Sequence, residues 1–411
     1  MSMAESSVHN VFMANNDLEE LGCKQSSNPP THFSESDPPD GGFRAWVTAF
    51  GWYISYFGVY QDFYTQIYLT NQTPWIGALT SFLTVNITLI SGPLYDRGWF
   101  YRLMMVGSSL QSLSLFTLSL AKPGQFYLVF MVQGVLAGIG MGLTYAPSVA
   151  LISQHFSKRR TLVMSLVTSG TPLGAIIHPI MIDHLLNGTV GFVKGVRAST
   201  GFVSALLLIA CLSMRTRALP TPSARYSAVA RKCSREVLLI LMTAGSMLCQ
   251  IGFYFPIFYL QLDSVQHGIN VDFSFYSLVI TNVACFIGRS TAGIIAAYTG
   301  VLNLMIVSNV ACSAIIMSMI ALSDIASVIA IGITYGYFSG ITALLVPLMT
   351  VLTPNLSELG ARMGLCFAFI AIGGLLGGPI SGALLSSHYQ WFIPSLFSGV
   401  SSLNCCCTSL H

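Results

Sequence analysis

The sequence predicts an all-α, polytopic membrane protein with twelve membrane-spanning helices in two pseudo-symmetric six-helix bundles. Three observations predict this fold class. Charged residues form 8% of the 411-residue chain and apolar residues 53%, whereas soluble domains carry roughly 25% charged residues. The chain contains repeated uncharged apolar stretches, each close to or longer than the roughly 20 residues needed to cross a bilayer. A basic segment, residues 215–236, divides these stretches six and six.

The chain opens with a polar segment, residues 1–42, that holds seven acidic residues and one lysine. This composition predicts a disordered cytoplasmic tail rather than a signal peptide. We expect the first six-helix bundle at residues 43–214, a basic cytoplasmic linker at 215–236, and the second bundle at 237–411.

Charge-free intervals set the bounds of the expected spans. The twelfth is weak, because it is short and rich in serine and cysteine, and it reads as a damaged or truncated helix. In chain order the spans are 45–69, 75–95, 103–121, 126–152, 161–182, 198–214, 237–262, 273–300, 302–323, 326–352, 363–385 and 389–410.

The distribution of Lys and Arg predicts the orientation. Twelve spans put both termini on one side, and with a cytoplasmic N-terminus fourteen of the eighteen Lys and Arg residues face the cytosol. Three then lie in outer loops and one lies within a span. This asymmetry follows the positive-inside rule, and it places the sequons at Asn71 and Asn187 outside the cell, where glycosylation is sterically feasible.

Arg289 is the one Lys or Arg that lies deep in an apolar run, near the middle of residues 273–300. An arginine there costs about 2.5–3.5 kcal/mol on insertion scales and is tolerated where it faces water, a partner or a substrate. A guanidinium can hold a carboxylate with two parallel hydrogen bonds. We therefore expect Arg289 to bind an anionic solute in a cavity; the alternative is that it only pairs with helix carbonyls or an acid.

The sequence holds no catalytic constellation. It contains no metal-spaced His/Asp cluster, no glycine-rich phosphate loop and no nucleophile beside a base, and its cysteines fall mostly inside apolar runs. We expect no enzyme activity, no cofactor, no metal and no nucleic-acid partner. The expected partners are a small organic anion, protons and the lipid bilayer, with the chain as a monomer.

Small residues recur at four-residue spacing in two spans. Such spacing lets helix backbones approach closely within lipid, so we interpret these glycines as packing residues rather than ligand contacts. They are Gly134, Gly138 and Gly142 in the fourth span, and Gly374, Gly378 and Gly382 in the eleventh.

Four stretches resemble one family, and a fifth resembles the superfamily that contains it. Residues 39–46 (PDGGFRAW), 153–160 (SQHFSKRR), 254–259 (YFPIFY) and 287–293 (IGRSTAG) are similar to motifs of the monocarboxylate transporter family, in its fungal form. Residues 92–98 (GPLYDRG) resemble the loop between the second and third helices of the major facilitator superfamily. The family signature falls on Asp40, Gly41 and Gly42.

This resemblance implies the major facilitator fold and a proton-linked or facilitative carrier of small carboxylates, most simply in the plasma membrane. It also implies that Arg289 engages the substrate carboxylate. Animal members carry an aspartate where this chain has Cys285, so their proton relay does not transfer. Asp62 and His178 are substitute proton-coupling candidates, with a boundary or packing role as the alternative for each.

Charged residues at neighbouring span ends form a candidate cytoplasmic gate. Asp96 and Arg97 close the second span, and Lys158, Arg159 and Arg160 precede the fifth. An acid and bases at facing helix ends could form ion pairs that stabilise one conformer and separate in the other. The same basic residues also act as topology determinants.

Aromatic residues supply further substrate-binding candidates, chiefly Tyr60 and Tyr254, with helix packing as the alternative. An aromatic cavity wall would favour a solute larger and flatter than lactate. This leaves open, beside a small monocarboxylate, the export of a fungal secondary metabolite or a vitamin-like acid. A non-transporting sensor or degenerate carrier is the rival from another class, favoured by the weak twelfth span.

Overall fold

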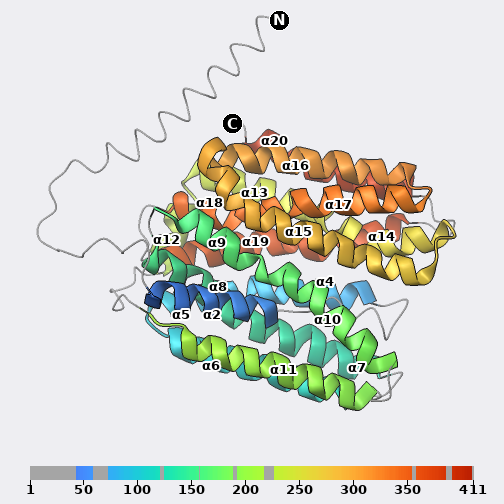
Figure 1. The fold of residues 1–411 in the computed structure, drawn as a ribbon. Helices are drawn as coiled ribbons and strands as arrows, with labels where there is room; N and C mark the ends of the chain where they lie inside the picture. The colour runs from blue at the N-terminus through green and yellow to red at the C-terminus, as the bar shows by residue number, and fades with distance from the viewer. Residues whose placement is uncertain are drawn as a thin grey trace, which may run out of the picture. The chain divides into compact units, whose positions relative to one another are not determined.

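A computed structural model describes residues 43–58, 73–120, 125–156, 158–187, 192–216, 226–353, 358–385 and 391–409. Within these ranges the chain forms helices and short connections, without a β-strand. Figure 1 shows the helices of the first half, blue to green, beside those of the second half, yellow to red.

The helices of the first half follow the six expected spans in order, with residues 59–69 of the first span outside the described part of the chain. They are α2 (Phe43–Gly58); α4 (Thr73–Asn86) and α5 (Thr88–Asp96); α6 (Phe100–Leu118); α7 (Phe126–Val129), η1 (Phe130–Leu136) and α8 (Ala137–His155); α9 (Arg160–Thr168) and α10 (Gly170–Asn187); and α11 (Phe192–Ser213).

The second half repeats this arrangement after a short helix, α12 (Tyr226–Cys233), within the expected linker. Across the described residues, nine helical stretches are long and apolar enough to cross a membrane, and α20 adds a shorter apolar stretch, Phe392–Leu403. The second-half helices are α13 (Val237–Phe253) and α14 (Phe255–Gln266); α15 (Val271–Thr299); α16 (Val301–Ser318) and η2 (Met319–Ala321); α17 (Ile325–Ile341), η3 (Thr342–Leu344) and α18 (Leu345–Val351); α19 (Leu359–Leu384); and α20 (Phe392–Ser409).

Proline interrupts two spans that line the space between the halves. Pro256 occupies the first turn of α14, and α13 ends at Phe253, with Tyr254 between the two helices. Pro172 follows the break between α9 and α10 at Ser169. Proline has no N–H to continue a helical ladder and its ring clashes with the preceding turn, so each expected span is two helices in series.

The glycines of the fourth span pack α8 against α4 and α5. A Cβ added to Gly138 would lie 3.1 Å from the carbonyl oxygen of Thr80, and one added to Gly142 would lie 2.7 Å from that of Thr84. Side chains at these positions would push the helices apart. The predicted packing role of this glycine stripe is confirmed.

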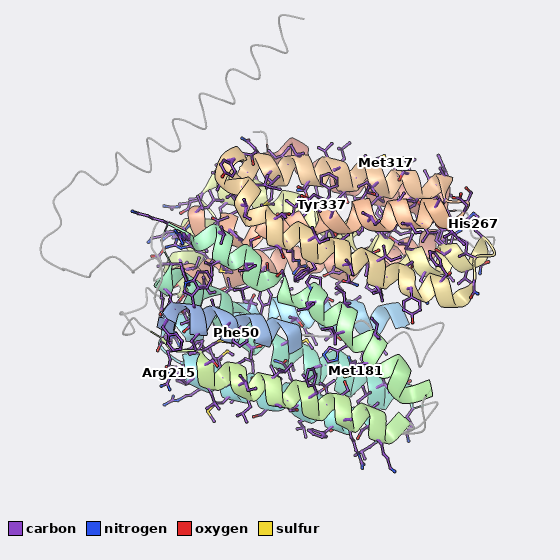
Figure 2. All side chains as sticks on the ribbon, viewed as in Figure 1. Phe50, Met181, Arg215, His267, Met317 and Tyr337 are labelled. Carbon is purple, nitrogen blue, oxygen red and sulfur yellow. The ribbon has the colours of Figure 1, made fainter. Side chains whose placement is uncertain are left out.

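Hydrophobic contacts join the two halves at one end of the helices. One buried cluster contains residues of both halves, such as Tyr95 of α5 and Leu344 of η3. Two further clusters stay within one half each, around Leu118 in the first and Ile316 in the second. The joined end is called the Asp96 end below, and Figure 2 shows Arg215 at this end and His267 at the opposite one.

Candidate substrate-binding cavity

A cavity of about 360 Å³ lies between the two halves. Its walls come from α4, α8, α9 and α10 of the first half and from α13 to α19 of the second. Most lining residues are apolar, hydroxyl-bearing or amide-bearing. Arg289 is the one lining residue, among those described, that carries a full charge.

Arg289 projects from α15 into this cavity, as the sequence predicts, and it also contacts the first half. Its Nη1 donates a hydrogen bond of 2.9 Å to the carbonyl oxygen of Thr168, the last residue of α9. Its Nε is buried and has no hydrogen-bond partner among the described residues. Arg289 thus pairs with a helix carbonyl and also lines the cavity, so the structure combines the two alternatives.

A serine contact fixes the backbone beneath this guanidinium. The Ser165 hydroxyl of α9 donates to the carbonyl of Arg289 and accepts from the N–H of Gly293 at 3.0 Å. Gly293 lacks a side chain where α9 approaches, since an added Cβ would lie 2.6 Å from Cα of Leu162. The backbone around Arg289 is therefore docked onto the first half.

Aromatic rings form part of the cavity wall. Tyr254 lines it from the break between α13 and α14, and its ring stacks on Phe258 with centroids 5.6 Å apart. Tyr145 of the first half meets Phe367 of the second edge to face at 5.9 Å. Tyr254 is therefore placed where the sequence predicts; Tyr60 lies outside the described residues.

Polar groups without a charge complete the lining. Thr171, on α10, has a buried Oγ1 without a hydrogen-bond partner in the described part of the chain. Gln250 of α13 and Asn282 of α15 also line the cavity, and Asn282 donates to the carbonyl of Leu278 at 2.9 Å. Asn282, Gln250 and Thr171 therefore give the cavity wall a polar character without adding charge.

Of the two proton-coupling candidates, the described one, His178, does not line this cavity. His178 is buried on α10 and packs against the ring of Phe202 of α11, with centroids 6.3 Å apart. It is absent from the described cavity lining. Asp62 lies outside the described residues.

Asp96 connects the two halves at the end named after it. Its Oδ2 accepts a hydrogen bond of 2.9 Å from the N–H of Ala361, and its Oδ1 accepts one of 3.3 Å from the N–H of Gly360. These N–H groups belong to the first turn of α19, where the helix dipole favours negative charge. Asp96 therefore contacts the second half through the backbone, whereas the prediction paired it with bases.

The predicted basic partners take other positions. Arg97, Lys158 and Arg159 are exposed at the Asp96 end. Arg160 is half-buried, and its Nε donates to the carbonyl of Phe156 at 3.1 Å.

An ionic network that the sequence analysis missed surrounds Arg362 at the start of α19. Both of its terminal nitrogens bind Glu236 at 2.7 Å, and its Nε lies 3.6 Å from Glu358. Lys232 of α12 reaches Glu358 at 2.6 Å. The Arg362 side chain is only 3% exposed. The i, i+4 spacing of Glu358 and Arg362 was a usable signal, but Glu236 is 126 residues away.

A buried thiol lies beside this network. Burial raises the pKa of Cys233, the last residue of α12, so this thiol stays protonated near neutral pH. Among the described residues no group of three His, Cys, Asp or Glu side chains could hold a metal ion.

Several predicted positions lie beyond what the structure describes. The signature residues Asp40, Gly41 and Gly42 and the sequon residue Asn71 fall outside the described ranges. Asn187 is the last residue of α10, and its side chain is not described.

Sequence relatives share most of this chain. The aspyridones efflux protein apdF of Emericella nidulans is 30% identical over 384 residues, which cover 90% of this chain and 78% of that protein. The agnestins efflux protein AgnL12 of Paecilomyces divaricatus is 31% identical, covering 84% and 79%. The fujikurins efflux protein of Gibberella fujikuroi is 31% identical, covering 93% and 85%.

Solved structures share the fold at low sequence identity. The outward conformation of the transporter FucP has a TM-score of 0.69 at 15% identity and covers 89% of this chain and 98% of its own. The human organic anion transporter MFSD10 has a TM-score of 0.73 at 11% identity, covering 90% and 100%.

A match to the family itself spans residues 43–350. This match, the extended similarity to the three efflux proteins and the arrangement of helices agree. The chain therefore belongs to the Major Facilitator Superfamily of transporters and is a multi-pass membrane protein with the major facilitator fold.

Proposed function

We propose that this protein exports an anionic, largely aromatic fungal secondary metabolite by alternating access, with Arg289 as the counter-ion of the substrate. One observation carries the proposal. Arg289 is the one residue with a full charge, among those described, in the lining of the cavity between the halves. An acidic oxygen would balance this charge through a charge-assisted hydrogen bond.

The cavity favours a solute larger than lactate. Sites that bury drug-sized ligands have volumes of roughly 300–1,000 Å³, and the cavity here measures about 360 Å³. Tyr145, Tyr254 and Phe367 offer ring faces and edges to a flat molecule. Three relatives bear the names of efflux proteins, which supports export.

A small monocarboxylate remains the second candidate. The motif resemblance to monocarboxylate transporters supports it, as does a single guanidinium suited to one carboxylate. Proton coupling would then need a titratable group, for which Asp62 and His178 stay the proposed positions. For either substrate we propose a plasma-membrane location, a cytoplasmic N-terminus and a monomer.

Transport in oriented vesicles tests the proposal. The full chain is reconstituted, and inside-out vesicles are offered 1-naphthoate, lactate or 1-naphthamide, with and without a pH gradient. We expect saturable uptake of 1-naphthoate that exceeds uptake of lactate and of the uncharged amide. Preferential lactate uptake would favour the monocarboxylate carrier, and no uptake of any acid would favour the sensor or degenerate carrier.

A further inference from the structure

We propose that Pro172 and Thr168 are positioning residues that aim the Arg289 guanidinium into the cavity and tie it to the opposite half of the protein. This inference rests on the proposed function, because it assigns a purpose to the orientation of the substrate's counter-ion. It concerns the point where α9 ends and α10 begins.

The carbonyl of Thr168 lacks a hydrogen-bond donor from its own span. In a continuous α-helix this oxygen would accept the N–H of the residue four positions later, which is residue 172. Proline has no N–H, and Pro172 therefore leaves the Thr168 carbonyl without its helical donor. Such an orphaned carbonyl at a helix end needs another partner and attracts cations.

The side chain of Arg289 supplies a donor in place of the missing backbone N–H. Nη1 of Arg289 donates to this oxygen at 2.9 Å, from α15 of the other half. It is the one hydrogen bond to the Thr168 carbonyl among the described residues. Thr168 is 2% exposed, and the contact with Arg289 is partly buried.

The contact with Thr168 uses only part of the guanidinium. Arginine has five N–H donors in a planar fork. With Nη1 held by Thr168, Nη2 makes no hydrogen bond among the described residues, and unlike Nε it is not a buried atom without a partner. Nη2 is therefore the donor that remains for an anion. Fixing the fork before binding reduces the conformational entropy that binding would otherwise cost.

The same contact ties the halves together. Ser165 reaches the backbone of Arg289 one turn earlier on α9, so side-chain and backbone contacts to Arg289 both cross from α9 to α15. Thr168, Pro172 and Arg289 all line the cavity. The residue that would bind the substrate is thus also part of the seal between the halves.

Substitution of Pro172 by alanine tests this assignment, because alanine restores an N–H that can bond the Thr168 carbonyl. Pro379→Ala is the matched control, since it removes a helical proline from α19 that does not line the described cavity. Binding of 1-naphthoate and of the uncharged 1-naphthamide is measured on the full-length protein in lipid nanodiscs.

We expect Pro172→Ala to weaken 1-naphthoate binding about tenfold, a factor that corresponds to about 1.4 kcal/mol, and to leave 1-naphthamide binding unchanged. In an Arg289→Gln background the same substitution should have no further effect, because the two residues act through one contact. Unchanged 1-naphthoate affinity, equal losses for both probes, or additive effects in the double variant would overturn the assignment.

A second measurement needs no solute. It tests the roles of Pro172 and Thr168 even if the wild type binds neither probe. Cys249 and Cys285 line the cavity, and their modification by a thiol reagent is followed by peptide mass spectrometry. Loss of the Arg289 contact should raise their labelling rate severalfold in Pro172→Ala but not in Pro379→Ala. Equal rates in the wild type and Pro172→Ala would refute the tie. Failure of probe binding with raised labelling would instead count against the proposed substrate class alone.

Discussion

A single guanidinium serves the packing of the two halves and the lining of the cavity in this protein. Arg289 donates from Nη1 to the Thr168 carbonyl, and the same residue lines the cavity. A lysine could supply the charge but not the fork, because an ammonium lacks fixed planar donors. The chemistry at this position therefore depends on geometry as well as on charge.

Arg289→Ala should abolish transport of organic anions while the protein still inserts into the membrane. Arg289→Lys should recover little of the activity, since bidentate hydrogen bonding is lost. Uptake of 1-naphthoate by vesicles, normalised to inserted protein, measures both variants. Normal uptake by the alanine variant would refute the assigned role, and near-full activity of the lysine variant would indicate simple charge attraction.

The Arg362 pair should matter for stability. Glu236→Gln removes the nearer of the two carboxylates that face the nearly buried Arg362 and leaves Glu358 at 3.6 Å, and charged hydrogen bonds are worth about 1.5–3 kcal/mol. We expect the lower part of this range, because Glu236 is 38% exposed and solvent screens the pair. A lower melting temperature in detergent would show the loss.

The exposed Arg159 provides the control for that measurement. Arg159→Gln removes a charge at the same end of the protein, and exposed substitutions usually change stability by no more than about 0.5 kcal/mol. An equal effect of the two substitutions would mean that the Arg362 network contributes no more than any surface charge.

At the scale of elements, the contact of α5 with α19 closes the Asp96 end. Gly92 and Gly360 meet backbone to backbone there, and Asp96 binds the first turn of α19 directly beside them. Residues Thr88 and Gly364 continue the same close approach one turn further along each helix. The second and eleventh spans therefore touch without intervening side chains.

Gly92→Ala should prevent this closure, because an added Cβ would overlap the carbonyl of Gly360. We expect transport to fall to background, with faster labelling of Cys285 by a thiol reagent applied from the Asp96 end. Gly201→Ala is the control, since nothing lies within 4 Å of its added Cβ. Retained transport in Gly92→Ala would show that the two helices tolerate separation.

The positions of the spans could be predicted from the sequence, but the helix breaks within them could not. Charge-free intervals located the spans because a bilayer excludes unpaired charge, and the deep position of Arg289 predicted that it faces a cavity. The break at Ser169 was not predicted, although Pro172 signals it, because hydropathy alone does not distinguish one helix from two in series. The Glu236–Arg362 pair depended on folding, which brings together residues 126 positions apart.

At the scale of the whole molecule, the asymmetric distribution of basic residues predicts the orientation. A protease site placed at the N-terminus should be protected in intact cells and cleaved after permeabilisation, because the positive-inside rule places this terminus in the cytosol. Protease digestion followed by immunoblotting measures it. Cleavage in intact cells would reverse the topology.

The seal between α5 and α19 has a consequence for biogenesis. Asp96 leaves the ribosome early, whereas the N–H groups that it binds belong to Gly360 and Ala361, more than 260 positions later. A nascent chain halted before α19 carries a completed first half whose carboxylate still lacks this backbone partner. This contact therefore forms only after α19 has been synthesised, and a chain that a nonsense mutation ends ahead of residue 359 cannot make it.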